Sequence, residues 1–176
     1  FIVHDLRQNF KFPRRDLHIL LKFFRFYHAN QQSCFCRKRH IMIYGIGCDL
    51  CSTARMAKSL GGAHGPAFAA RVFGPSEREA LGLTGGIPDP LSAHRSASAA
   101  ADFAAKEAFL KAAGTGLAGP FALCEIEAVR LESGAPEYRF SGGSARWMAA
   151  HGLRASLSLS HDGGMALAFC ILETET

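Results

Sequence analysis

The stretch Phe103-Ala-Ala-Lys-Glu-Ala-Phe-Leu-Lys-Ala-Ala-Gly-Thr-Gly116 is the end of a helical run that begins near Ala93. Its alanines and long charged residues favour a helix, and the two glycines at its end stop it. A period of about 3.6 residues per turn places Glu107 on the same side as Phe103 and Leu110, in a stripe that should be buried. A carboxylate in such a place is costly unless it is paired or bound to a metal.

Two explanations of Glu107 stay open from the residues alone. In the first, Glu107 forms an ion pair with Lys111, one helical turn later and in the favourable orientation, worth about 0.2–0.5 kcal/mol. Asp102 and Lys106 have the same spacing, and we expect them to form the same kind of pair. In the second, Glu107 binds a metal ion together with another oxygen ligand.

A second carboxylate in an unusual place is Asp49, in the segment Met42-Ile-Tyr-Gly-Ile-Gly-Cys-Asp-Leu50. The β-formers of this segment alternate with small residues, which predicts a strand with Asp49 near its end. Aspartate is disfavoured inside strands, so its position calls for a reason. Oxygens from Asp49 and Glu107 together would suit Mg²⁺, with water and substrate phosphate completing an octahedron.

The segments around these two elements predict short helices early and strands late. Helices are expected over residues 52–60, from residue 75 and over 145–151, and strands over 121–131, 137–140, 154–160 and 165–172. The segment His161-Asp-Gly-Gly164 should be the turn of a hairpin between the last two strands. This order of elements indicates an α+β domain.

Positive charge is concentrated before Met42. The whole chain holds 20 Lys and Arg against 15 Asp and Glu, whereas residues 1–41 hold nine against two and residues 42–176 hold 11 against 13. The first 41 residues also contain half of the phenylalanines and no glycine. We interpret residues 1–41 as a basic, aromatic-rich extension from an over-extended or fragmentary reading frame, outside a native domain at residues 42–176. A true basic arm and a leader peptide are the alternatives.

Composition also limits the compartment and the partners. No stretch approaches the roughly 20 consecutive apolar residues of a membrane span, so we expect no membrane insertion. The six cysteines are scattered without a disulfide framework, which predicts reduced thiols in a cytoplasmic protein. Cys34 and Cys36 near His40 lack the usual spacing of a zinc site. The basic segment has no recognisable nucleic-acid module, and we expect no nucleic-acid partner.

Three motifs in this chain resemble, in their order, the signatures of holo-acyl-carrier-protein synthases, the short trimeric type of 4′-phosphopantetheinyl transferase. They are the segments at residues 42–49, 103–116 and 158–163, the last reading Ser-Leu-Ser-His-Asp-Gly. The resemblance covers residues 42–172, and the family typically begins at the methionine that matches Met42. It implies a 4′-phosphopantetheinyl transferase-like fold, in which a small antiparallel sheet packs with a long helix, and a homotrimer with active sites between subunits.

The resemblance also implies a reaction. Coenzyme A would donate its 4′-phosphopantetheine arm to a serine of apo-acyl carrier protein, for fatty acid biosynthesis, with release of adenosine 3′,5′-bisphosphate. The implied catalytic residues are Asp49 and Glu107, which would hold Mg²⁺ against the pyrophosphate, and His161, which we expect at the nucleotide or phosphate. The base stays open between a metal-activated water and Asp162. The residues implied to contact coenzyme A are Lys106, Lys111, Gly114, Thr115, Gly116, Ser160 and His161.

The chain departs from the family pattern where relatives carry positive charge. Asp102 stands where the family usually has Arg, and Ala135 replaces the lysine of a Gly-Lys-Pro turn. Of the basic residues expected to meet the carrier, only Arg55 and Arg71 are present. A degenerate, non-catalytic relative that binds coenzyme A or only assembles is therefore the alternative function.

Overall fold

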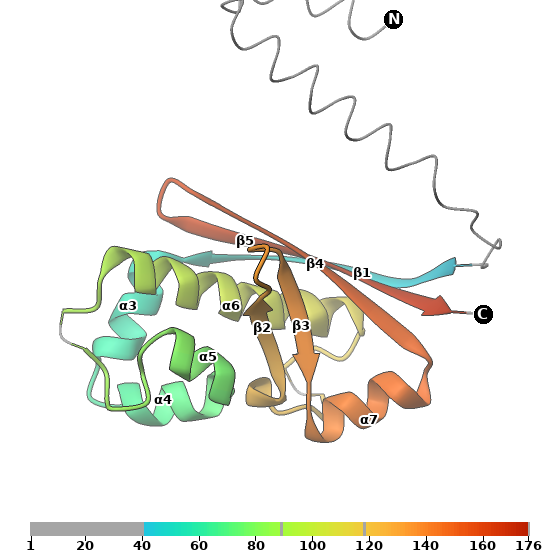
Figure 1. The fold of residues 1–176 in the computed structure, drawn as a ribbon, viewed down its shortest axis with the longest axis horizontal. Coiled ribbons are helices and arrows are strands. Elements are labelled where there is room, and N and C mark those ends of the chain that lie inside the picture. Colours follow the sequence, from blue (N-terminus) through green and yellow to red (C-terminus); the bar gives the residue numbers. More distant parts are fainter. Residues whose placement is uncertain (1–40, 89, 118, 176) are drawn as a thin grey trace, which may run out of the picture. The chain divides into compact units, whose positions relative to one another are not determined.

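The fold is built on strand β1 and helix α6, the two elements that carry Asp49 and Glu107 (Figure 1). The structure is a computed structural model that describes residues 41–88, 90–117 and 119–175. Its elements are β1 (Ile41–Ser52), α3 (Thr53–Gly61), α4 (Gly65–Val72), α5 (Pro75–Ala80), α6 (Ala93–Ala112), a 3₁₀ turn (Leu123–Glu125), β2 (Ile126–Arg130), β3 (Pro136–Phe140), α7 (Gly142–Ala150), β4 (Leu153–Asp162) and β5 (Met165–Glu175). The expectations for the basic extension and for Cys34 and Cys36 lie outside the described residues.

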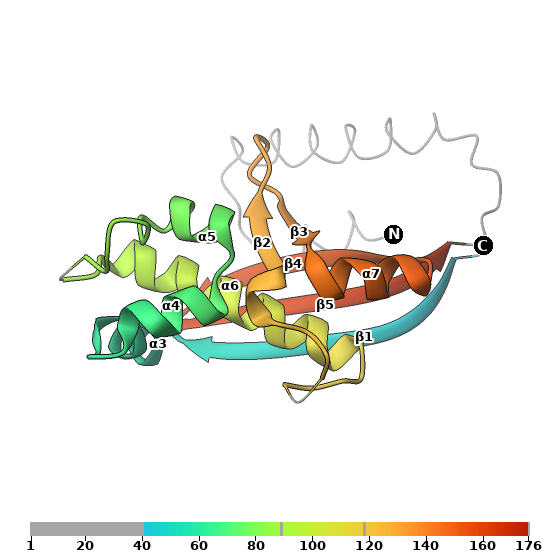
Figure 2. The same ribbon diagram turned by 90° about the horizontal axis from the view of Figure 1, so that it is seen from below.

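Strands β1, β5 and β4 form an antiparallel sheet in that order, and α6 lies across one of its faces (Figure 2). The helix approaches very closely because the residues beneath it are small. A Cβ atom added at Gly45 or Gly47 of β1 would overlap the backbone carbonyl oxygen of Ala112 or Ala108, respectively. The alternation of glycines in β1 is therefore what allows the strand and the helix to cross with their backbones in contact.

On its other side, α6 is covered by the β2–β3 hairpin and by α7 (Figure 2). Phe109 of α6 is fully buried there, and its ring lies 4.9–6.2 Å, centroid to centroid, from four other rings. These belong to Phe121, Tyr138, Phe140 and Trp147. The only tryptophan of the chain thus packs against the core. The helix is held between two layers, which fits the expected α+β class.

The strand expected over Phe121–Leu131 is wrong in its first half. Residues 123–125 form a 3₁₀ turn, and the strand begins only at Ile126. The physical reason is a cap: the carboxylate of Glu125 accepts hydrogen bonds from the backbone N–H groups of Gly143 (3.0 Å) and Ser144 (3.2 Å), at the start of α7. This role holds Glu125 out of an extended strand.

Two further differences concern a missed helix and a shorter turn. Helix α4 was not predicted, although Pro66 in its first turn is a common starting signal. The expected turn around residues 161–164 is confined to Gly163 and Gly164, both with positive φ, as two-residue hairpin turns favour. His161 and Asp162 therefore belong to strand β4, paired with Ala166 and Met165.

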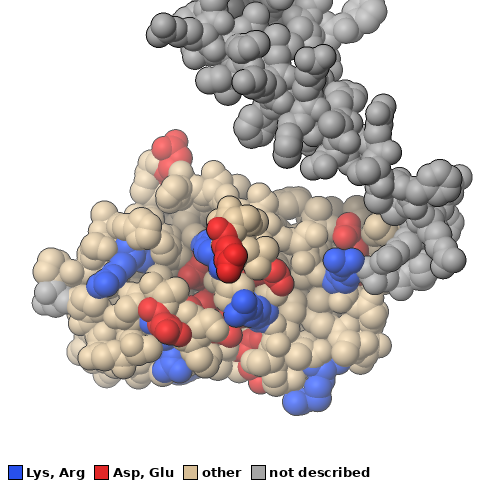
Figure 3. Space-filling model, in the orientation of Figure 1, with Lys and Arg blue, Asp and Glu red and all other residues tan. Residues whose placement is uncertain are grey.

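The surface of the described residues carries mixed charges. Figure 3 shows basic and acidic side chains interspersed over the drawn face, which agrees with the nearly balanced charge count after residue 41. The four described cysteines are free thiols, as expected. Within the described ranges, no helix combines the length and apolar character needed to cross a membrane.

Candidate active site

Asp49 reaches α6 because it lies on the same face of β1 as the two glycines that contact the helix. Gly45, Gly47 and Asp49 alternate along the strand, so all three point toward α6. The Nζ atom of Lys111 donates a hydrogen bond to Asp49 Oδ1 (2.8 Å) and another to the backbone carbonyl oxygen of Cys48 (2.9 Å). The side chains of Asp49 and Lys111 are 17% and 51% exposed, so this ion pair stands at the surface.

Glu107 lies close enough to Asp49 for the two negative charges to repel. The pKa of Glu107 is raised, first by burial and then by the charge of Asp49, while Lys111 opposes the shift. The thiol of Cys51 senses the same two carboxylates: its pKa is raised mainly by burial and further by Asp49 and Glu107, against a hydrogen bond with Arg55. Two carboxylates that are distant in the sequence therefore converge at the crossing of β1 and α6.

Lys111 does not form the ion pair with Glu107 that the helical spacing allowed. Among the described residues Lys111 bonds to Asp49 of β1, and no ion pair joins it to Glu107. The hydrogen bond to Asp49 raises the pKa of Lys111. The ammonium group thus places a positive charge beside the carboxylate pair, where the two negative charges call for a cation.

This donor set fits Mg²⁺ better than a structural metal. Among the described residues, no three His, Cys, Asp or Glu side chains gather as they would around zinc. Asp49 and Glu107 supply two hard oxygen ligands, and Mg²⁺ usually keeps several waters and binds substrate phosphates through its other positions. The repulsion between the two carboxylates is the feature that a divalent cation would relieve.

The Gly114–Gly116 loop, which we expected to contact coenzyme A, uses its N–H groups within the fold. Gly114 and Gly116 have positive φ, and their N–H groups donate to the carbonyl oxygens of Lys111 and Leu110 at the end of α6. The N–H group of Thr115 also donates to Leu110. The loop is therefore a helix cap. The hydroxyl of Thr115 is buried and has no hydrogen-bond partner among the described residues, and its oxygen presents no surface to a ligand.

His161 and Ser160 lie away from the two carboxylates within one chain. His161 pairs with Ala166 of β5, which pairs in turn with Cys51 of β1, so two strand spacings, about 10 Å, separate His161 from β1. Both His161 and Ser160 are exposed on the edge strand β4. The structure thus brings Asp49, Glu107 and Lys111 together, and leaves His161 and Ser160 outside the group.

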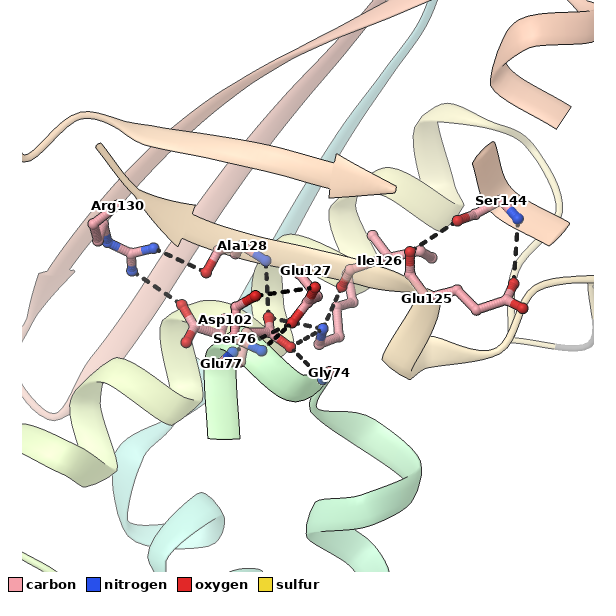
Figure 4. Close-up of polar contacts among 11 residues, drawn as sticks. Gly74, Ser76, Glu77, Asp102, Glu125, Ile126, Glu127, Ala128, Arg130 and Ser144 are labelled. Atoms are coloured by element: carbon pink, nitrogen blue, oxygen red, sulfur yellow. Dashed lines mark hydrogen bonds and ion pairs between the residues drawn. The ribbon is translucent and has the colours of Figure 1, made fainter. Parts of the chain in front are cut away.

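Lys106 occupies a different environment from the one expected. It is fully buried, and its Nζ atom donates to both carboxylate oxygens of Glu77 (2.8 and 2.6 Å) and to the carbonyl oxygen of Ile126. The expected pair between Asp102 and Lys106 is wrong, since Asp102 binds Arg130 (3.0 Å; Figure 4). Both helix residues point toward the hairpin, where stronger partners lie. The three N–H donors of Lys106 are all used within the fold, so none is left for substrate phosphate.

Three glutamates with specific partners escaped the sequence reasoning. Glu77 binds Lys106, Glu125 caps α7, and Glu127 caps α5 by accepting from the N–H groups of Ser76 (2.7 Å) and Glu77 (3.3 Å; Figure 4). The Gly-Pro-Ser-Glu spacing at residues 74–77 is a helix-start signal that could have identified Glu77, which also accepts from the N–H of Gly74. No local signal identifies the partners of Glu125 and Glu127.

Residues 45–170 match the sequence profile of the 4′-phosphopantetheinyl transferase superfamily. This chain belongs to that superfamily. A relative in Methylobacterium sp., named holo-[acyl-carrier-protein] synthase, is 42% identical over 137 residues, which cover 75% of this chain and 95% of the relative. The resemblance that the three motifs predicted is thereby confirmed.

Solved structures give the same fold. The holo-(acyl-carrier-protein) synthase of Bacillus anthracis, in complex with CoA (3′,5′-ADP), aligns with a TM-score of 0.60 at 30% identity, over 76% of this chain and 99% of that one. The Neisseria meningitidis holo-[acyl-carrier-protein] synthase aligns with a TM-score of 0.60 at 34% identity, over 76% and 100%. The predicted fold class is confirmed, and Asp49 and Glu107 both fall inside the region that matches the transferase superfamily.

Proposed function

We propose that this transferase moves the 4′-phosphopantetheine arm of coenzyme A to a serine of apo-acyl carrier protein, as a step that serves fatty acid biosynthesis. The observation that carries the proposal is the convergence of Asp49 and Glu107, beside Lys111, at the crossing of β1 and α6. It is supported by the names of relatives of nearly the same domain length and by the coenzyme A bound to the Bacillus anthracis protein. The active domain would comprise residues 42–176, in the cytoplasm.

The residues have distinct roles in this reaction. Asp49 and Glu107 would hold Mg²⁺, which when bound supplies positive charge at the pyrophosphate of coenzyme A. Lys111, once a metal ion neutralises Asp49, is free to turn its exposed ammonium toward the same phosphates. The serine oxygen of the carrier then forms a bond to phosphorus and loses its proton to a general base, and the phosphorus–oxygen bond to adenosine 3′,5′-bisphosphate breaks.

The outer face of the sheet supports assembly into a homotrimer. The face turned away from α6 exposes large apolar side chains of neighbouring strands, and monomeric proteins rarely leave such patches uncovered. They are Ile46 (53% exposed), Leu50 (51%), Leu167 (38%) and Phe169 (37%). Because His161 and Ser160 lie on the edge strand away from Asp49, each active site would take these two residues from a neighbouring copy, beside the nucleotide.

The experiment is a transfer assay followed by mass spectrometry of the carrier protein. Apo-acyl carrier protein, coenzyme A and Mg²⁺ are incubated with the full chain, with the chain starting at Met42, and with Asp49→Ala and Glu107→Ala. We expect the carrier to gain one phosphopantetheine arm with the first two proteins only, and chelation of Mg²⁺ to stop the reaction. Coenzyme A binding without any transfer would favour the degenerate relative, and full activity of either variant would overturn the metal assignment.

A further inference from the structure

Glu77 and Lys106 form a buried ion pair. Both side chains are fully buried. The Lys106 ammonium donates to both carboxylate oxygens and to the Ile126 carbonyl oxygen, which accounts for its three N–H donors. The Glu77 carboxylate accepts two further hydrogen bonds, from the N–H groups of Gly74 and Ala128, each at 2.8 Å (Figure 4).

These contacts join three elements at one point. Gly74 is the N-cap of α5, Ile126 and Ala128 belong to β2, and Lys106 lies in the middle of α6. At the residue just before Lys106, the hydroxyl of Tyr138 on β3 donates to the carbonyl oxygen of Ala105 at 2.7 Å. Hydrogen bonds to neighbouring positions of α6 fix both its rotation about its axis and its position along the axis, which apolar contacts do less sharply.

A buried ion pair is an expensive way to hold a helix. Two ions lose their hydration on burial, and replacing such pairs by apolar side chains of similar size is often neutral or stabilising. The fully buried ring of Phe73 lies 5.9 Å from the Lys106 ammonium, so the pair borders the apolar core. A gain in stability alone is therefore a poor explanation for the pair. Apolar side chains in its place would lack directional hydrogen bonds.

Fixing the orientation of α6 at Lys106 also fixes the orientation of the next residue, Glu107. On the opposite side of the helix, Gly45 and Gly47 hold β1 against α6, and β1 carries Asp49. Asp49 and Glu107 repel each other while no divalent cation lies between them. Separating the two elements would relieve that repulsion, so the geometry of the carboxylate pair needs a rigid frame on the far side of the helix.

We propose that Glu77 and Lys106 are positioning residues, which hold α6 so that Glu107 faces Asp49 at the spacing of a divalent metal site. This inference rests on the proposed function, because it assumes that the two carboxylates bind the metal. It assigns a role in the reaction to two buried residues that touch neither metal nor substrate. Their effect passes through the backbone of α6.

The test measures binding of Mn²⁺ alone to the full chain, by electron paramagnetic resonance, since carboxylate and water ligands suit Mn²⁺ as well as Mg²⁺. The double variant Glu77→Gln/Lys106→Met keeps the side-chain volumes and removes both charges. We expect its Mn²⁺ affinity to fall about 10- to 100-fold, the usual effect of losing groups that orient metal ligands. In the transfer assay its kcat should fall, while the KM for the carrier stays unchanged.

A matched control is the other ion pair on the same side of α6. Asp102→Asn/Arg130→Met removes a pair that is one turn further from Glu107 and partly exposed, and its Mn²⁺ affinity should equal that of the wild type. If the first double variant does not fold, Glu77→Asp keeps both charges and withdraws the carboxylate by one methylene group. We expect it to lower Mn²⁺ affinity in a folded protein.

The outcomes separate the inference from the proposed function. If wild-type protein binds Mn²⁺ and the folded Glu77 and Lys106 variants bind it equally well, the pair is only structural and the inference is overturned. If wild-type protein transfers phosphopantetheine but binds no Mn²⁺, the metal site fails and the inference fails with it. A loss of Mn²⁺ affinity in the control as large as in the test variant would also overturn it.

Discussion

Helix α6 carries two clusters of charged side chains that use the same residue types in opposite ways. The site cluster comprises Asp49, Glu107 and Lys111, and the hairpin cluster comprises Glu77, Lys106, Asp102 and Arg130. In the hairpin cluster the Lys106 ammonium and the Glu77 carboxylate have a full set of partners and lie in the core. In the site cluster two carboxylates share one partly exposed ammonium.

The contrast shows that a charge at an odd position is not in itself a sign of catalysis. Lys106 is the more deeply buried of the two lysines, yet its contacts are complete and leave nothing for a ligand. Glu107 is only partly buried, but it lies near the negative charge of Asp49, which repels its own. A deficit of compensating charge marks the functional side of the helix, whereas completed hydrogen bonding marks the structural side.

Removing the Lys106 side chain should have the largest effect on stability. Lys106→Ala leaves the Glu77 carboxylate buried without its counter-ion, which should lower the free energy of unfolding by about 3–5 kcal/mol. Urea denaturation followed by circular dichroism measures this change. Lys58→Ala, on the exposed surface of α3, is the control and should stay within about 0.5 kcal/mol of the wild type. A Lys106→Ala protein as stable as the control would show that the hairpin cluster is not needed for folding.

Neutralising Glu107 should impair the transfer reaction and leave stability intact. Glu107→Gln should lower the transfer rate by about 100- to 1000-fold, the scale of losing one electrostatic contact in an active site. The free energy of unfolding should stay the same or rise, because the repulsion from Asp49 disappears. Glu132→Gln at the exposed β2–β3 turn serves as the control in both measurements. Loss of stability together with retained transfer would mean that Glu107 belongs to the structural side after all.

The sequence predicted the site elements because their signals are local. Helical periodicity and terminal glycines placed α6, and the small-residue alternation placed β1 with Asp49 near its end. The choice between an ion pair and a metal site for Glu107 depended on the distance between a strand and a helix. That distance follows from Gly45 and Gly47, whose close contact with α6 exists only in the folded chain.

The hairpin cluster escaped prediction because its partners are distant in the sequence. The spacing of Asp102 and Lys106 permits a pair within the helix, but the fold offers Glu77, Ile126 and Arg130 at better geometry. Spacing along a helix indicates which of its own side chains can form a contact. It gives no information about residues of other elements that can bind the same side chains. The strand start at Ile126 was misplaced for the same reason, because the cap made by Glu125 serves a helix that follows later in the chain.

The contact between β1 and α6 can be tested by adding a single methyl group. Gly47→Ala places a Cβ where the carbonyl oxygen of Ala108 lies, which should lower the free energy of unfolding by about 1–3 kcal/mol and separate Asp49 from Glu107. Transfer should therefore fall as well, and thermal unfolding and the transfer assay measure the two effects. At Gly61 a Cβ would meet no atom within 4 Å, so Gly61→Ala should leave both unchanged. An unimpaired Gly47→Ala enzyme would show that the close crossing is not what sets the site.

Asp102 should give the stability of the protein a dependence on pH. Burial, then the charge of Glu77, raise the pKa of Asp102 from 3.8 to about 7, against the opposing Arg130. Since the folded protein then binds this proton more tightly than the unfolded chain, the free energy of unfolding should fall as pH rises from about 4 to 7, by at most about 1.4 kcal/mol per pH unit. Asp102→Asn, measured by urea denaturation between pH 4 and 8, should remove this contribution.

The two ends of that range decide what the Asp102–Arg130 contact does. At pH 4 the folded protein holds the Asp102 proton and the unfolded chain still binds it in part, so the variant and the wild type should differ least in stability. At pH 8 the wild type holds a buried carboxylate against a guanidinium that is 39% exposed, and Asp102→Asn should be the more stable protein. A variant that instead loses stability at pH 8 would show that the pair attracts strongly enough to offset its burial. Asp102 would then resemble Glu77 as a satisfied anion, and the hairpin cluster would be structural throughout.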